Sequence, residues 1–84
     1  MKSKVDPAFW RRFNALPLQV QQLARNALAL WLRDPFYSSL RFKKVKDDLW
    51  SVRIGDHYRV TGYFLTSDTF VWNWIGMHEE YNKL

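Results

Sequence analysis

Residues 50–61 alternate apolar and polar side chains on both sides of the segment Gly55-Asp56-His57. Alternation over two neighbouring segments predicts a β-hairpin. A three-residue loop puts every apolar residue of the hairpin on one face, whereas a two-residue turn places Val52 opposite Arg59 and mixes the faces. The expected pairs are therefore Ile54 with Tyr58, Arg53 with Arg59 and Val52 with Val60.

The expected pairing sets two arginines, Arg53 and Arg59, directly opposite each other. Like charges in this position destabilise a hairpin by about 0.2–1 kcal/mol. Because a planar guanidinium binds phosphate through two hydrogen bonds, we interpret the pair as an anion site for phosphate. The alternative is that each arginine forms an ion pair with Asp47, Asp48, Asp56 or a carboxylate of the C-terminal tail.

The composition of the chain limits the class of protein. Eighty-four residues predict one domain, 1–84, and 18% aromatic residues supply large side chains for its small core. The absence of cysteine excludes disulfides and zinc–thiolate sites. A formal charge of +5 favours a polyanionic partner, either nucleic acid or an acidic protein. With no signal-peptide pattern after Met1 and no long apolar run, we expect a soluble, cytoplasmic protein without membrane contact.

Two helices are predicted in the first 33 residues, followed only by strands. Asp6-Pro7 is a typical helix start, and the residue before Pro35 is expected to end the second helix. Between them, apolar residues recur at helical spacing: Val20, Leu23, Ala24, Ala27, Leu28 and Trp31. Strands are expected at 40–43, 50–54, 58–64 and 69–75, the last one covered on both faces. The expected fold is α+β, a two-helix hairpin packed on a twisted antiparallel sheet of three or four strands.

The last two strands should form an antiparallel hairpin, which brings the segment 76–78 beside 57–59. Arg53, Arg59, His57 and His78 then gather at one end of the sheet. Histidine is suited to acid–base chemistry near neutral pH, because its ordinary pKa is about 6.5; the alternative is a solvated tail residue.

Three further residues stand near this end of the sheet. Alternation sends Lys43 and Lys44 to opposite faces, so one of them is expected near the arginines. Tyr81 either stacks on a base or caps the core. No cofactor motif occurs, and two histidines without carboxylates at ligand spacing indicate no metal site.

Taken together, segments along nearly the whole chain resemble the RelE/ParE superfamily of small toxins from bacterial type II toxin–antitoxin systems. The order and spacing of these segments carry the resemblance: Leu16-Pro17, Val20-Gln21, Ala24, Ala27, Trp31, Asp34-Pro35, Leu40-Arg41-Phe42-Lys43, Trp50-Ser51-Val52-Arg53-Ile54, Tyr58-Arg59, Trp74-Ile75-Gly76-Met77-His78 and Tyr81. The sequence departs from the family at Ser51, where some RelE-like members carry a basic residue. It also leaves only Lys2–Val5 for an N-terminal strand.

The resemblance implies two alternative activities. RelE-like members cut mRNA in the ribosomal A site of the 70S ribosome, with the 2′-hydroxyl as nucleophile. In that reading Arg53, Arg59 and His78 are catalytic, and the substrate-binding residues are Lys43, Lys44, His57 and Tyr81. ParE-like members instead inhibit DNA gyrase. Both kinds are neutralised by a cognate antitoxin, and a member that only binds its antitoxin is a third possibility.

Overall fold

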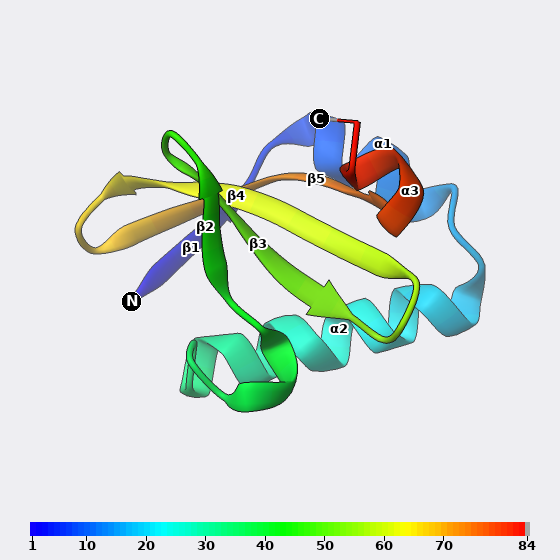
Figure 1. The fold of residues 1–84 in the computed structure, drawn as a ribbon, viewed down its shortest axis with the longest axis horizontal. Coiled ribbons are helices and arrows are strands. Elements are labelled where there is room, and N and C mark those ends of the chain that lie inside the picture. The colour runs from blue at the N-terminus through cyan, green and yellow to red at the C-terminus, as the bar shows by residue number, and fades with distance from the viewer. Residues whose placement is uncertain (84) are drawn as a thin grey trace.

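The computed structural model describes residues 1–83 as one five-stranded mixed sheet with helices on both sides (Figure 1). The strand order is β1-β5-β4-β3-β2, so the two longest strands, β4 and β5, lie inside the sheet. The elements in chain order are β1 (Lys2–Val5), α1 (Pro7–Asn14), α2 (Leu18–Arg33), the 3-10 helix η1 (Ser38–Leu40), β2 (Lys43–Lys46), β3 (Leu49–Ile54), β4 (Tyr58–Thr66), β5 (Thr69–Met77) and α3 (His78–Tyr81).

Helix α1 begins, and helix α2 ends, where the sequence predicts. The Asp6 carboxylate accepts a 2.8 Å hydrogen bond from the Ala8 backbone N–H and caps α1, with Pro7 in the first helical position. Helix α2 ends at Arg33, just before the Asp34-Pro35 pair. The apolar stripe of α2 buries Ala24 and Trp31, but Leu23 is 47% exposed.

The β3–β4 hairpin has the predicted register. Arg53 is paired with Arg59, Ile54 with Tyr58 and Val52 with Val60. Gly55 has a φ of +59°, a left-handed conformation that glycine adopts without strain, and this allows the short loop. The predicted contact between strand ends is also present, because Arg59 is paired with Gly76 of β5.

One face of the sheet packs against α1 and α2 and forms the core. Trp31 of α2 is its centre, with the rings of Phe42, Phe70 and Trp72 lying 4.8–5.5 Å from it between centroids. Val52, Ile54, Val60 and Ile75 complete the sheet side of this core. Trp72 is therefore a core residue, as its apolar neighbours predict. Trp74 lies only half-buried.

The expectation of a purely antiparallel sheet of three or four strands was wrong. The sheet has five strands, and β1 pairs in parallel with β5. The strand β1 is four residues of mostly polar sequence at an edge, so neither periodicity nor apolar content indicates it. Residues 40–43 also differ from the predicted strand: η1 ends at Leu40, Arg41 has a φ of +47°, and β2 begins only at Lys43.

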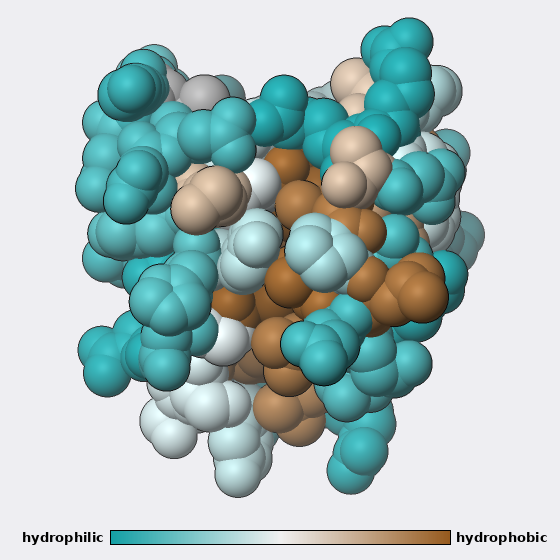
Figure 2. Space-filling view, turned by 90° about the vertical axis from the view of Figure 1, so that its right-hand side faces the viewer, coloured by the Kyte–Doolittle hydropathy of each residue, from teal (hydrophilic) through white to brown (hydrophobic). Residues whose placement is uncertain are grey.

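Apolar side chains reach the surface at the end of the molecule where the β3–β4 loop and the start of α2 lie. Figure 2 shows this end as an apolar band between hydrophilic flanks. The exposed large apolar residues include Leu18 and Leu23 of α2 and Met77 at the end of β5. Among residues 1–83, no helix is long and apolar enough to cross a membrane.

Candidate functional site

The second face of the sheet carries the polar residues of the central strands. Cross-strand pairing sets Ser51 beside Thr61, and Arg53 beside Arg59. Residues that are paired directly across two strands share a face of the sheet. Val52 and Ile54, which flank Arg53 on β3, point to the other face, into the core. The pairing therefore directs both arginines to the face opposite α2, as the alternation predicts, and the Arg53 side chain also reaches the edge of the sheet, where it borders a pocket next to α2.

The structure gives Arg53 an acidic partner within its own hairpin. Its Nη2 atom lies 2.6 Å from Asp56 Oδ1, and its Nε atom donates to the Gly55 carbonyl at 3.0 Å. The alternative ion pair with Asp56 is thus present at this arginine. The Asp56 side chain is 79% exposed, so solvent and salt weaken the pair.

Arg59 has a different environment. Its Nη1 atom donates to its neighbour's carbonyl, Tyr58 O, at 2.9 Å, and within residues 1–83 no carboxylate lies in ion-pair distance of it. Burial and then repulsion from Arg53 lower the pKa of Arg59; Tyr81 acts in the opposite direction, and Arg41 adds further repulsion. An anion placed here relieves this repulsion.

Helix α3 lies beside the arginines and carries two more of the predicted site residues. The Tyr81 ring lies under the Arg59 guanidinium, 5.9 Å from centroid to Cζ, and its hydroxyl donates to Ser51 Oγ at 3.3 Å. The His78 ring stacks on the Tyr81 ring at 5.7 Å. His78 Nδ1 is buried and has no hydrogen-bond partner in the described part of the chain. His78 is thus half-buried against the site.

The remaining predicted residues are divided between the site and its surroundings. Lys43 is paired with Ser51 and so shares the face of the arginines, whereas Lys44 is paired with Trp50 on the core side. His57 is exposed in the hairpin loop, and its backbone carbonyl accepts the His78 N–H at 2.7 Å. The structure therefore places Lys43 near the site, Lys44 away from it, and His57 at its rim.

Arg41 is a site neighbour that sequence reasoning did not single out. A strand was predicted over 40–43, whereas Arg41 lies in a turn with a positive φ. The signal that could have found it is the number of basic residues between positions 41 and 59. Arg41 and Arg53 line a pocket of about 580 Å³ between η1, α2 and the end of β3. Arg59, His78 and Tyr81 do not line this pocket, so it borders the site at Arg53.

The site residues fit an anion better than a metal ion. Arginine and lysine do not ligate metals, and no cluster of three or more His, Cys, Asp or Glu side chains suited to a metal occurs in residues 1–83. A cationic group that has no acidic partner among residues 1–83, a second arginine, a hydroxyl and an imidazole can together bind a phosphate and exchange protons with it.

Solved toxin structures share this fold at low sequence identity. YafQ from Escherichia coli superposes with a TM-score of 0.77 at 7% identity, covering 95% of this chain and 96% of its own. The RelB–RelE antitoxin–toxin complex from Methanococcus jannaschii gives 0.75 at 13% identity, covering 95% of each chain. The YoeB/ParE toxin from Agrobacterium tumefaciens gives 0.73 at 16% identity, covering 93% of this chain and 99% of its own.

Sequence comparison identifies the family. No curated protein sequence matches the chain. The family model described as the ParE-like toxin domain matches residues 18–83, which span α2, every strand except β1, and α3. The chain therefore belongs to the ParE-like toxin domain family, within the RelE/ParE superfamily that its sequence resembles.

Proposed function

We propose that this protein is the toxin of a type II toxin–antitoxin system and cleaves mRNA on the ribosome. One observation carries the proposal: Arg59 is partly desolvated, is repelled by Arg53 and Arg41, and has no acidic partner among the described residues. A phosphodiester of RNA supplies the negative charge that this arrangement lacks. The type of reaction, cleavage of mRNA, is proposed from the resemblance to RelE-like toxins.

In the proposed reaction the 2′-oxygen of the RNA attacks the adjacent phosphorus, and the 5′-oxygen of the next nucleotide leaves. A 2′,3′-cyclic phosphate and a 5′-hydroxyl result. Negative charge grows on the non-bridging oxygens, where Arg59 and, once released from Asp56, Arg53 stabilise it. Lys43 is paired with Ser51, two residues before Arg53 on β3, and binds the neighbouring phosphate.

Protons move twice in this reaction: the 2′-hydroxyl loses one and the 5′-oxygen gains one. His78 stacks on Tyr81, whose ring also lies against Arg59, and we assign the His78 imidazole to this exchange. Tyr81 offers a ring on which a base stacks and a hydroxyl that contacts Ser51 only at 3.3 Å. We assign it to binding of the nucleotide at the cleaved bond.

The test uses purified ribosomes programmed with a defined mRNA. We expect cleavage within the A-site codon, mapped by primer extension, and loss of cleavage in Arg59→Ala and His78→Ala. An intact message in the presence of the folded wild-type protein overturns the proposal.

The second candidate is inhibition of DNA gyrase. The matching family model carries the ParE name, and the Arg53–Asp56 ion pair leaves one of the two arginines already neutralised. Inhibited supercoiling, together with toxicity that survives His78→Ala, identifies this activity.

We further propose that an acidic, amphipathic antitoxin segment neutralises the protein. Two features support this partner: the basic face around Arg59, and the apolar band at the same end of the molecule (Figure 2). The neighbouring open reading frame is the first candidate, and its product is expected to co-purify with the protein and suppress its toxicity.

A further inference from the structure

Helix α3 carries His78 and Tyr81 but is only four residues long. A single helical turn is not stable by itself in water, so tertiary contacts must fix its position. Two of these contacts belong to residues already assigned to the site: the His78 N–H donates to His57 O at 2.7 Å, and the Tyr81 hydroxyl reaches Ser51. The third comes from α1, at the opposite end of the sequence.

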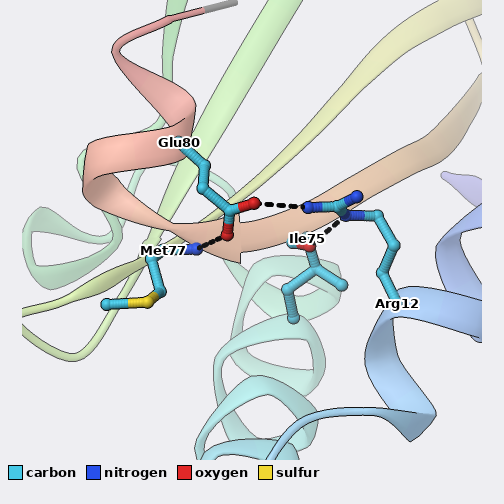
Figure 3. A network of polar contacts seen from close by, with 4 residues as sticks. All are labelled: Arg12, Ile75, Met77 and Glu80. Carbon is cyan, nitrogen blue, oxygen red and sulfur yellow. Dashed lines mark hydrogen bonds and ion pairs between the residues drawn. The ribbon is translucent and has the colours of Figure 1, made fainter.

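Arg12 of α1 joins three parts of the molecule (Figure 3). Its Nε atom donates to the Ile75 carbonyl of β5 at 2.9 Å, and its Nη2 atom donates to Glu80 Oε2 of α3 at 3.0 Å. Its guanidinium also lies over the Trp74 ring, 5.1 Å from the centroid. The planar fork of arginine is well suited to these directed contacts, which lysine cannot reproduce together.

Glu80 links Arg12 to the start of α3. Its second oxygen, Oε1, accepts the Met77 backbone N–H at 3.3 Å, so the two carboxylate oxygens hold different groups. Glu80 immediately precedes Tyr81 and lies two residues after His78. Rotation or displacement of α3 therefore breaks contacts of Glu80 on both sides.

We propose that Arg12 is a positioning residue: through Glu80 it fixes α3 so that Tyr81 lies against Arg59 and His78 stacks on Tyr81. This inference rests on the proposed nuclease function. The Arg12 and Glu80 side chains are 40% and 54% exposed, so their ion pair alone adds little to folding stability. The reaction rate is far more sensitive to the position of α3, because a displacement of about 1 Å at a reacting group lowers the rate about 100-fold.

The experiment compares Arg12→Gln and Glu80→Gln with matched controls on the same helices. Arg11→Gln and Glu79→Gln remove the same charges from exposed neighbouring positions. For cleavage of programmed ribosomes, we expect kcat to fall about tenfold or more in the two test variants, with KM within about twofold of wild type. The controls keep the wild-type kcat. The double variant R12Q/E80Q should be no slower than R12Q alone, because both substitutions break one connection.

Amide hydrogen exchange at His78 tests the position of α3 without any activity. Its N–H is protected by His57 O, so exchange reports opening of α3. We expect exchange about fivefold faster in R12Q and unchanged in R11Q, with Tm altered by no more than about 2 °C. Arg12→Lys keeps the charge but not the fork, and should give intermediate exchange and kcat.

Unchanged exchange at His78 in R12Q overturns the inference, whatever the activity. Faster exchange with an unchanged kcat overturns it as well, because α3 then moves without consequence for the reaction. If the wild-type protein does not cleave RNA, the proposed function fails, whereas the exchange comparison still decides whether Arg12 fixes α3.

Discussion

Arg53 and Arg59 are direct partners across the β3–β4 hairpin, yet only Arg53 has a carboxylate beside it among residues 1–83. The Asp56 side chain sits in the hairpin loop, three residues beyond Arg53, and neutralises that guanidinium at 2.6 Å. Arg59 faces Tyr81 instead. The hairpin therefore holds one screened and one unscreened positive charge, and the unscreened one is the centre of the proposed site.

Replacing Arg59 with glutamine is expected to stabilise the free protein while abolishing RNA cleavage. Burial and repulsion from Arg53 lower the pKa of Arg59, so the fold disfavours its charge. Removing one of two like charges that lie directly opposite each other raises the free energy of unfolding by about 0.2–1 kcal/mol, which raises Tm by a few degrees for a domain of this size. Thermal unfolding at low salt measures the gain, and ribosome cleavage measures the loss.

The control for this comparison is Arg53→Gln, which relieves the same repulsion but also breaks the ion pair with Asp56. Its Tm should stay near that of the wild type. A lower Tm for Arg59→Gln than for Arg53→Gln would show that the fold does not oppose the charge at Arg59.

Replacing Asp56 with asparagine is expected to release Arg53 for phosphate. RNA affinity at low salt should rise severalfold, since a neutral side chain no longer competes for the guanidinium. One additional phosphate contact steepens the dependence of log Kobs on log salt concentration by about 0.7 for single-stranded nucleic acid. Binding of a short RNA, measured at several salt concentrations, gives this slope; an unchanged slope rules Arg53 out as a phosphate ligand.

Tyr81→Phe separates the hydroxyl of Tyr81 from its ring. The ring contacts with His78 and Arg59 remain, and only the 3.3 Å hydrogen bond to Ser51 is lost. The Arg12–Glu80 contact and the His78 N–H still hold α3 in this variant, so if the ring alone positions the nucleotide, kcat should change by less than about threefold. Ser51→Ala is the matched control, since it removes the same hydrogen bond from the other side. A much larger loss in Tyr81→Phe than in Ser51→Ala assigns the hydroxyl to the reaction itself.

Local alternation was enough to predict the hairpin and its arginine pair. Val52 and Ile54 must both reach the core, and only one loop length allows this, so the register follows from neighbouring residues. The position of His78 beside His57 then follows from the antiparallel order of β4 and β5. Choosing between phosphate and Asp56 as the partner of Arg53 required side-chain positions, because both readings satisfy the same pattern.

Most of the features that residue patterns alone did not reveal depend on contacts between distant residues. Arg12 and Glu80 are 68 residues apart, and neither belongs to a motif. The strand β1 forms only by parallel pairing with β5, at the other end of the chain. Arg41 departs from a strand because its φ is positive, which its short alternating neighbourhood does not reveal.

Gly76 is expected to be required for the contact between β5 and α3, for a steric reason. A Cβ atom at this position would lie 2.6 Å from Trp74 Cζ2 and 3.2 Å from Glu80 Oε1, so the indole that lies beneath Arg12 would have to move. We expect Gly76→Ala to destabilise the fold by about 1–3 kcal/mol, measured by chemical denaturation. In a Trp74→Val background the obstructing ring is absent, so the same alanine should cost much less there than in the wild-type protein. If the alanine costs the same with and without the indole, the obstruction lies elsewhere. If the cost falls when the indole is absent, Gly76 is needed because the Trp74 ring lies across this position and supports Arg12.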